Sequence, residues 1–398
     1  AGKGFFINTG SAVTVTLPAS PSVGNEVIVV DSTGQAACNA ITLGRNGSKI
    51  KGGCQDLLMT TNRGGLRIVY SGSSQGWVTA TAGNDATMQP AFITATGGTE
   101  STSGDFKIHT FTSDGTFTVS KLAVASANNK VSYIVVAGGG SGAPSQGCVG
   151  TSGGGAGGFR EGRNSPVDTY TASPLAAADS GLTVTASAFP VTVGAGGTAG
   201  AITYPNSKGV NGSNSIFSTI TSAGGGFGTG GGAPGPSGTQ VPGGPGGSGG
   251  GGGTCGNSGS SADPGGTGNT PPVSPAQGTN GGSGAAAAAN NGGGGGGATA
   301  SGTNGTSPGG CGGAGATTNI TGSPVAYAGG GGGGNSPSYA STGGTGGGAA
   351  GKTRSSGAAA NAGTVNTGGG GAGSSGTPSN TAGGLGGSGV VIIRYKFQ

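Results

Sequence analysis

Alternation of apolar and polar residues predicts short strands at the start of the chain. Val13, Val15 and Leu17 alternate with threonine, so a strand here presents one apolar face. Further apolar runs follow, separated by turn residues, at 26–31, 41–43 and 66–70. We therefore predict a small all-β module over residues 1–82. Because so small a module has few large apolar residues to bury, we expect neighbouring subunits to complete its core.

A second group of strands follows a polar segment, 83–104, whose small residues indicate a linker. Residues 106–111 and 116–119 flank the turn Ser113-Asp114-Gly115 and predict a hairpin. Residues 131–137 add a strand, and residues 182–193 add a further β pair. The closing run, 390–397, is apolar on both faces for four residues, as in a central strand. We combine residues 105–137, 182–193 and 390–398 into one β-sandwich platform.

Between the platform strands lies a glycine-rich stretch, 138–389, which holds most of the chain's 103 glycines. It has clusters such as Gly292–Gly297 but no Gly-X-Y period. Composition alone would indicate a flexible linker or a disordered tract. The strands on either side favour an ordered structure. Because the chain returns to a well-formed strand at the end of this stretch, we expect the residues between the two strands to be ordered as well. We therefore predict an all-β fold with an additional non-regular, glycine-rich domain.

Runs of glycine can fold without a side-chain core. In a polyproline-II-type helix the chain has three residues per turn and a rise of ~3.1 Å, and its N–H and C=O groups point outward. Short helices of this kind can stack and bond to one another through N–H···O and Cα–H···O contacts. We predict ten such polyglycine-II-type rods: 138–142, 153–158, 224–232, 243–253, 281–297, 309–315, 329–334, 343–351, 368–373 and 383–389. An even count returns the chain to the platform.

Irregular spacers join the predicted rods and carry the proline, asparagine and tyrosine of the glycine-rich stretch and nearly all of its charge. With ten rods, the spacers at the tip far from the platform are 143–152, 233–242, 298–308, 335–342 and 374–382. Loops of this kind suit surface recognition, so we select one or two polar or aromatic residues from each of four: Gln146, Gln240, Asn304, Asn335 and Tyr339. Exposed tyrosines such as Tyr339 and Tyr327 anchor contacts with sugars and proteins. The alternative is that each tyrosine covers a rod end.

Composition narrows the classes of function. Charged residues make up 7 % of the chain, and its net charge of +5 arises from few charges of either sign. No basic patch interleaved with aromatic residues is present, so we predict no nucleic-acid partner. No apolar run approaches the ~20 residues of a membrane helix, so we predict no membrane insertion. The sequence shows no signal peptide and begins at Ala1 without methionine, which fits a processed chain or a piece of a longer one.

Sequence motifs give little support to catalysis or to a cofactor. Residues 346–353 match the phosphate-loop pattern formally, but no apolar strand precedes them and no helix pattern follows. The single His109 lies in a predicted strand, facing solvent or a neighbouring subunit. Acidic residues are too sparse for a convincing carboxylate pair. We therefore predict no enzyme, no catalytic residue, no metal and no cofactor.

The five cysteines show neither a CxxC pattern nor a His/Cys cluster, so a zinc site is not predicted. Cys38 and Cys54 lie in one β-rich module, and a disulfide between them is one reading. Free thiols that act as small apolar residues are the other reading.

Three segments carry a resemblance to a known family. They are His109–Val119, Tyr133–Gly140 and Gly386–Tyr395. Together they resemble the glycine-rich domain of tailed-bacteriophage tail-fibre proteins, over roughly residues 105–398. The N-terminal part is similar to a β module of phage fibres through Asp31-Ser32-Thr33-Gly34 and Gly76-Trp77. Interrupted runs such as Gly224-Gly225-Gly226-Phe227-Gly228 depart from the family's pattern, so the packing of the rods is expected to be less regular.

This resemblance implies a homotrimeric fibre protein located in the virion, at the distal tail fibre. It also implies contacts with other phage tail or fibre proteins and recognition of a bacterial surface polysaccharide or outer-membrane protein by the tip loops. We therefore predict a non-catalytic adhesin of the tail fibre or its tip. The alternatives are a purely architectural fibre or spacer protein, and a bacterial surface or matrix adhesin.

Overall fold

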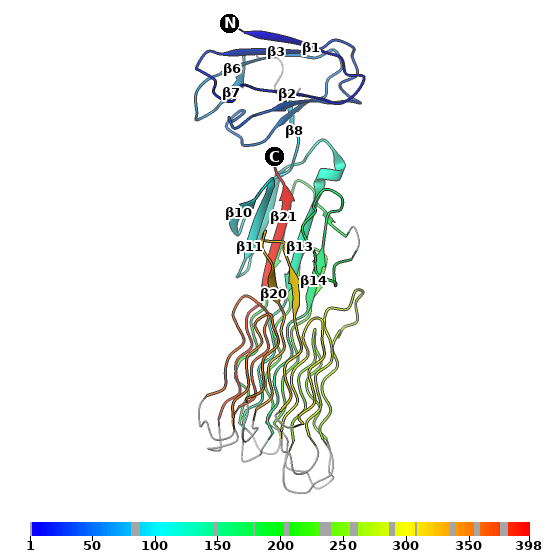
Figure 1. The fold of residues 1–398 in the computed structure, drawn as a ribbon, viewed down its shortest axis with the longest axis vertical. Coiled ribbons are helices and arrows are strands. Elements are labelled where there is room, and N and C mark those ends of the chain that lie inside the picture. Colours follow the sequence, from blue (N-terminus) through cyan, green and yellow to red (C-terminus); the bar gives the residue numbers. More distant parts are fainter. Residues whose placement is uncertain are drawn as a thin grey trace.

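The computed structural model describes residues 2–80, 88–145, 150–177, 180–202, 207–230, 240–254, 262–285, 291–306, 309–334, 340–353, 359–374 and 381–398. The molecule is elongated, with an N-terminal β module, a β-sandwich and a glycine-rich body following one another along its long axis (Figure 1). Regular structure in the described residues is almost entirely β, and the one helix among them is a short 3-10 turn, η2 (Ser126–Asn129). The predicted all-β class is confirmed.

The N-terminal module consists of two four-stranded sheets that share one core. The first has the order β1 (Lys3–Ile7), β3 (Glu26–Asp31), β6 (Gly65–Tyr70) and β7 (Trp77–Thr79). The second has the order β2 (Val13–Thr16), β4 (Ile41–Gly44), β5 (Leu57–Met59) and β8 (Met88–Pro90). Their apolar faces meet around Val29, Ile41, Leu43, Ile68 and Trp77, all fully buried. The alternation seen in the sequence therefore positions this core as expected.

The predicted linker over 83–104 is wrong for the part that the structure describes. Residues 88–104 form β8, β9 (Thr94–Thr96) and β10 (Thr99–Ser103), and each strand joins a different sheet. Strand β8 completes the N-terminal module, whereas β9 and β10 belong to the sandwich. The strands were missed because β8 has only three residues and β9 and β10 are rich in threonine and serine, so none shows an alternating apolar face in the sequence.

Two sheets form the sandwich that the sequence predicted. One has the order β10, β11 (Phe106–Phe111), β21 (Val390–Lys396), β13 (Lys130–Val136) and β14 (Phe159–Gly162), with β15 (Leu182–Thr183) also paired to β13. The other has the order β18 (Ile220–Ser222), β17 (Ser215–Phe217), β16 (Ala188–Thr192), β12 (Gly115–Lys121) and β9. The closing strand β21 lies in the middle of its sheet, as predicted. Phe111, Phe117, Val135, Phe217 and Ile393 fill the space between the sheets.

Two predicted strand pairings are wrong, although the strands exist. Strand β11 pairs with β10 and β21, whereas β12 pairs with β16 and β9, so they form no hairpin. Likewise β15 pairs with β13 and not with β16. In each case the connection carries the chain from one sheet of the sandwich to the other, and a local apolar pattern does not record that crossing.

His109 does not face solvent, contrary to the prediction. Its side chain is fully buried, with Nδ1 2.6 Å from the carbonyl oxygen of Gly97 and Nε2 3.2 Å from the hydroxyl of Tyr395. The imidazole also stacks on the Tyr395 ring at 5.6 Å between centroids. Burial lowers the pKa of His109 and outweighs the hydrogen bond to Gly97, which favours the charged form. The histidine is therefore a neutral core residue.

Beyond the sandwich, the glycine-rich body consists largely of extended segments lying side by side (Figure 1), all drawn from the part of residues 138–389 that is not in the sandwich strands. The described segments are 138–145, 150–158, 194–202, 207–214, 223–230, 240–246, 248–254, 262–268, 278–285, 291–298, 301–306, 309–315, 328–334, 340–345, 348–353, 359–364, 368–374 and 381–389. Outgoing and returning segments alternate. The prediction of ten rods is wrong because runs such as 243–253 contain a reversal, here at 246–248.

Hydrogen bonds within the body repeat every three residues. The segment 153–158 donates its backbone N–H groups to three neighbours in rotation, with N···O distances of 2.8–3.1 Å. The acceptors, in order along the segment, are the carbonyls of Gly293, Gly371, Gly226, Gly296, Gly368 and Ala223. Each neighbouring segment is thus met by every third residue. Backbone groups that would otherwise be buried without partners are satisfied in this way by the backbone itself.

The close approach of these segments explains why glycine is required. A Cβ at Gly154 would overlap the carbonyl oxygen of Gly140, and a Cβ at Gly294 would overlap that of Cys311. Since the colliding atoms are backbone atoms of neighbouring segments, they cannot move aside independently. The body therefore packs through main-chain contacts, which is why 31 % hydrophobic residues suffice for an ordered chain.

Candidate functional site

Segments that are distant in the sequence converge at the end of the body farthest from the sandwich. The N–H of Ser145 donates to the carbonyl of Thr381 at 2.8 Å, and that of Thr254 donates to Gly150 at 2.9 Å. Gly334 donates to the carbonyl of Thr151 at 2.8 Å. These contacts join the ends of segments separated by up to hundreds of residues into one base. The described ends of those segments therefore form one hydrogen-bonded base.

Two hydroxyl side chains strengthen this base. The Thr151 hydroxyl donates to the carbonyl of Ser374 at 2.6 Å, and the Ser152 hydroxyl donates to the carbonyl of Gly251 at 2.6 Å. Both residues are fully buried. They hold neighbouring segments together where the glycine run gives way to other residues. Sequence reasoning missed them, and their only signal is that a polar pair directly precedes the run Gly153–Gly155.

Two of the five selected residues fall within the described part of the chain, and both are exposed. Gln240 donates from Nε2 to the carbonyl of Ala262 at 2.9 Å. Asn304 accepts a hydrogen bond from the N–H of Ser283 at 2.9 Å. Each therefore ties two segments together near the far end. Gln146, Asn335 and Tyr339 lie outside the described residues.

The prediction that 298–308 is a tip loop is wrong at its first residues. Ala298 belongs to the apolar cluster beside the sandwich, and 299–300 form the reversal there. Asn304 lies instead within the extended segment 301–306. Tyr327 is 6 % exposed and belongs to the same cluster, so it covers the sandwich end of the body rather than standing free.

Asp263 is a buried carboxyl near the far end. It is 8 % exposed, and its Oδ1 accepts a hydrogen bond from the N–H of Val241 at 3.1 Å. Burial raises the pKa of Asp263 to about 6, even though that hydrogen bond favours the carboxylate. The folded protein therefore binds this proton more tightly than the unfolded chain does.

Replacing Asp263 with asparagine should remove a pH dependence of stability. Between pH 4 and pH 6 the folded state holds more protons than the unfolded state, so its stability falls as the pH rises. Asp263→Asn keeps an oxygen that can accept from Val241, and at pH 7 it should be more stable by about 1–3 kcal/mol. Thermal melting of both proteins at pH 4 and pH 7 tests this. If the change in melting temperature between pH 4 and pH 7 is the same for Asp263→Asn as for the parent protein, the prediction is wrong.

A family described as a glycine-rich domain matches residues 110–396, which is most of the chain. The chain belongs to the glycine-rich domain family. The match runs from β11 to the last residue of β21, so the glycine-rich domain includes the framing strands as well as the body. Comparison with curated proteins finds no match.

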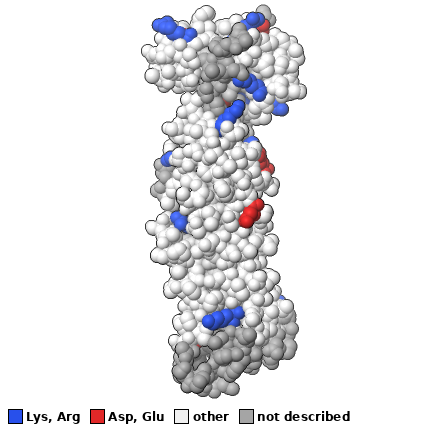
Figure 2. All heavy atoms as spheres, turned by 180° about the vertical axis from the view of Figure 1, so that it is seen from behind, with Lys and Arg blue, Asp and Glu red and all other residues white. Residues whose placement is uncertain are grey.

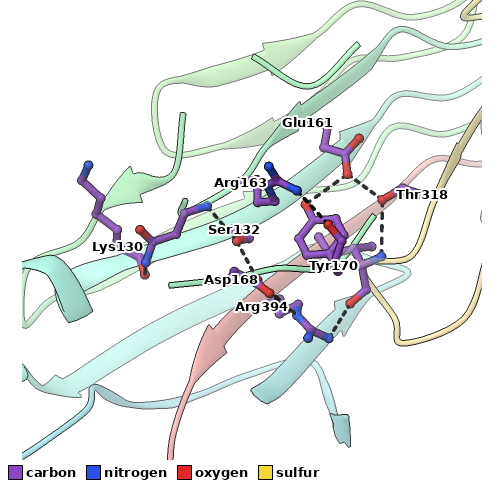
Figure 3. A network of polar contacts seen from close by, with 10 residues as sticks. Lys130, Ser132, Glu161, Arg163, Asp168, Tyr170, Thr318 and Arg394 are labelled. Carbon is purple, nitrogen blue, oxygen red and sulfur yellow. Dashed lines mark hydrogen bonds and ion pairs between the residues drawn. The ribbon is translucent and has the colours of Figure 1, made fainter. Parts of the chain in front are cut away.

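The most strongly buried charges of the glycine-rich domain form a cluster beside β13 and β21 (Figure 3). Nε of Arg394 lies 3.1 Å from both carboxylate oxygens of Asp168, which also accepts from the Ser132 hydroxyl at 2.8 Å. A second guanidinium nitrogen of Arg394 donates to the carbonyl of Ile320 at 3.1 Å. The Arg394 charge also lies 4.2 Å from the centroid of the Phe106 ring. Arg394 thus contacts a carboxylate, a backbone carbonyl and an aromatic ring at once.

Glu161 occupies the neighbouring part of the cluster. It accepts from the hydroxyls of Tyr170 at 3.0 Å and Thr318 at 2.5 Å, and from the N–H of Ser173 at 2.8 Å. Burial, followed by the nearby Glu161 charge, raises the pKa of Tyr170 far above its usual range. These groups join β14 to the strand β19 (Ala316–Thr318) and to the 170–173 segment. The cluster therefore serves to fasten the body onto the sandwich.

Other candidate sites receive no support from the described residues. Gly346 and Gly347 form a turn with φ of 95° and 94°, and an extended segment without helix follows as far as residue 353. Within the ranges given above, no group of His, Cys, Asp and Glu side chains could hold a metal ion. No helix in those ranges is long and apolar enough to cross a bilayer.

Cys38 and Cys54 are both exposed free thiols, so the disulfide considered for them is not formed in this structure. Cys311 is also free and half-buried. Cys148 and Cys255 lie outside the described residues.

Proposed function

We propose that this chain is a non-catalytic adhesin of a bacteriophage tail fibre or fibre tip. Its glycine-rich domain would present loops that recognise a receptor on the bacterial surface. The observation that carries the proposal is the convergence of many segment ends on one base, through contacts such as Ser145 with Thr381 and Gly334 with Thr151. A rigid base that gathers connections from the whole domain suits the display of a composite binding surface.

The rods of the body are proposed to be polyglycine-II-type helices. The three-residue rotation of hydrogen bonds along 153–158 supports this, because three residues complete one turn of such a helix. The overlap that a Cβ would cause at Gly154 and Gly294 supports it as well. In this proposal the helices provide stiffness, and recognition belongs to the residues between them.

Partners of three kinds are proposed. Self-association into a homotrimer is supported by β1, which among the described strands pairs only with β3 and leaves Phe6 78 % exposed. Other phage tail or fibre proteins would contact the N-terminal module in the virion. A bacterial surface polysaccharide or an outer-membrane protein would contact the far end. The acidic groups Glu161 and Asp168 are engaged by neighbouring residues, which supports a role without catalysis.

A cell-binding experiment with the full chain tests the proposal. The residues that follow the described segment ends at Gly334 and Ser374, namely 335–339 and 375–380, are replaced together by Gly-Ser sequences of equal length. A control variant replaces Ser323 and Pro324, which are exposed at the sandwich end. Labelled protein is applied to bacteria that the virion infects. We expect the far-end variant to lose binding and the control to retain it.

The same experiment separates the adhesin from an architectural spacer. If the intact chain fails to bind those bacteria and does not block infection, the adhesin proposal fails and a spacer role is favoured. Binding that survives replacement of both far-end connections would place recognition elsewhere. Light scattering of the intact chain measures its mass and tests the trimer separately.

A further inference from the structure

The glycine-rich body has one apolar side. The large apolar side chains that are exposed on its described segments are Ile202 at 36 %, Val210 at 40 %, Leu385 at 48 % and Val365 at 67 %. They belong to segments that follow one another around the surface, in the order 207–214, 194–202, 381–389 and 359–365. Backbone hydrogen bonds of 2.9 Å join each segment to the next, from Ser213 to Ala195, from Gly386 to Gly197 and from Gly363 to Leu385. These side chains therefore share one continuous side of the body.

The other sides of the body are polar. Segments 262–268, 301–306 and 340–345 expose hydroxyl, amide and proline side chains, among them Pro264, Thr267, Thr303, Asn304 and Thr342. Figure 2 shows a largely uncharged surface along the body. A body with water on every side would need no such difference between its sides. An apolar side on a soluble surface is typical of a contact with another molecule.

Charge does not interrupt the apolar side. Among the described residues of its segments, Lys208 is the one that carries a charge. Nζ of Lys208 lies 5.7 Å from the centroid of the Phe227 ring, so the side chain extends over segment 223–230 rather than over 194–202. A partner for this side must therefore be uncharged and apolar over a comparable length. The same side of another copy of this chain meets both requirements.

Segment 194–202 forms a corner of the body. An interior segment, 138–145, is surrounded by neighbours to which it is joined by backbone hydrogen bonds: 207–214, 381–389, 150–158, 194–202, 223–230 and 368–374. Packing of this kind is hexagonal. Among the described segments, 194–202 has such bonds only to 207–214, 138–145 and 381–389. With half of the hexagonal positions filled, the two sides that meet at this corner enclose about a third of a full turn.

Val210 and Leu385 lie on the two sides of this corner at the same height along the body. In the segment between them, the N–H of Ser141 donates to the carbonyl of Val210 at 2.9 Å, and the N–H of Gly142 donates to that of Gly384 at 2.8 Å. A rotation about an axis parallel to the segments therefore brings Val210 of one copy opposite Leu385 of the next without any sliding. At the corner itself, every third residue is exposed and small, namely Ala195, Thr198 and Ala201, which permits a close approach near the axis.

We propose that three copies of this chain pack around an axis along segment 194–202, with the Val210 side of each copy against the Leu385 side of the next. The proposal rests on the homotrimer of the proposed function and names the surface that the glycine-rich body contributes to it. Because the two contacting sides differ, the contact is heterologous, and corners that each fill about a third of a turn close into a ring of three. Apolar contact between the sides removes Val210, Leu385 and Val365 from water.

Disulfide cross-linking of the full chain tests this contact. Val210→Cys and Leu385→Cys are combined in a chain whose five native cysteines are replaced by serine. Mild oxidation should link most chains into covalent trimers on a denaturing gel without reductant. Either cysteine alone should give no link, because neither residue meets its own equivalent in the neighbouring copy. The matched control pair on the polar sides, Thr267→Cys with Thr342→Cys, should also remain unlinked.

Charges placed in the contact should weaken it, because association would bury them without partners. Val210→Asp with Leu385→Asp should raise the concentration at which trimers dissociate by at least about tenfold, measured by light scattering. Thr267→Asp with Thr342→Asp should leave that concentration unchanged, and unchanged thermal melting shows that both variants are folded.

The outcomes separate this contact from the wider proposal. Trimers in light scattering that fail to cross-link through Val210 and Leu385 would overturn this contact and leave the homotrimer in place. A chain that stays monomeric would overturn both. Neither result decides whether the chain is an adhesin, which depends on the cell-binding experiment.

Discussion

Replacing Arg394 with methionine is expected to destabilise the glycine-rich domain by about 3–5 kcal/mol. The substitution removes the partner of Asp168, which is 2 % exposed and would remain as an unpaired buried charge. It also frees the carbonyl of Ile320, to which Arg394 donates. Chemical denaturation followed by circular dichroism measures the loss.

Two comparison variants separate the buried pair from a general effect on β21. Lys396→Met, at the half-buried end of the same strand, should change stability by less than about 1 kcal/mol. The double variant Asp168→Asn with Arg394→Met should recover part of the loss, because no unpaired charge remains. A loss below about 1 kcal/mol for Arg394→Met alone would show that the cluster does not fasten the body to the sandwich.

A single methyl group inside the body should have an effect of similar size. Gly154→Ala places a Cβ on the carbonyl oxygen of Gly140, which already accepts from the N–H of Gly371 at 2.9 Å. Relief of the overlap requires two hydrogen-bonded segments to separate. We expect a loss of about 3 kcal/mol, at the upper end of ordinary overpacking. Hydrogen exchange at Gly371 should accelerate together with the drop in melting temperature.

The matched control for this substitution is Gly4→Ala on strand β1. No atom lies within 4 Å of a Cβ built at Gly4, so the added methyl group meets open space. Alanine also restricts the unfolded chain more than glycine does, and we expect a change within about 1 kcal/mol. Equal stability of Gly154→Ala and the parent chain would mean that the segments are packed more loosely than their contacts indicate.

Local patterns in the sequence were sufficient to locate many strands. The run 26–31 coincides with β3, and continuous apolar character at 390–397 correctly placed β21 in the middle of a sheet. That character exists because Ile392 and Ile393 face different apolar clusters on the two sides of the sheet. The pairing of the strands was harder to predict from the sequence. The turn after Phe111 predicts a hairpin, yet the chain there crosses from one sheet of the sandwich to the other.

The strands at both ends of the glycine-rich body were enough to predict that it is ordered. The path of the chain within the body could not be predicted. Reversals at 246–248 and 345–347 lie inside stretches rich in glycine. Pro245 directly precedes the first, but no proline stands beside the second, and neither reversal has a boundary of large apolar residues. The candidate site was similarly hidden. Thr151 and Ser152 matter because the packing brings Ser374 and Gly251 beside them, and nothing in the local sequence specifies those neighbours.

The backbone bonding of the body has a consequence for the evolution of this protein. Donors such as Gly154 and Gly157 are satisfied by main-chain carbonyls, so the packing places few demands on side chains elsewhere. Residues joining the segments at the far end can then change in identity or length while the body keeps its contacts. Doubling the length of a flexible connection costs only about 0.6 kcal/mol in closure entropy. Insertions and substitutions in these connections can therefore accumulate while the fold of the body is retained.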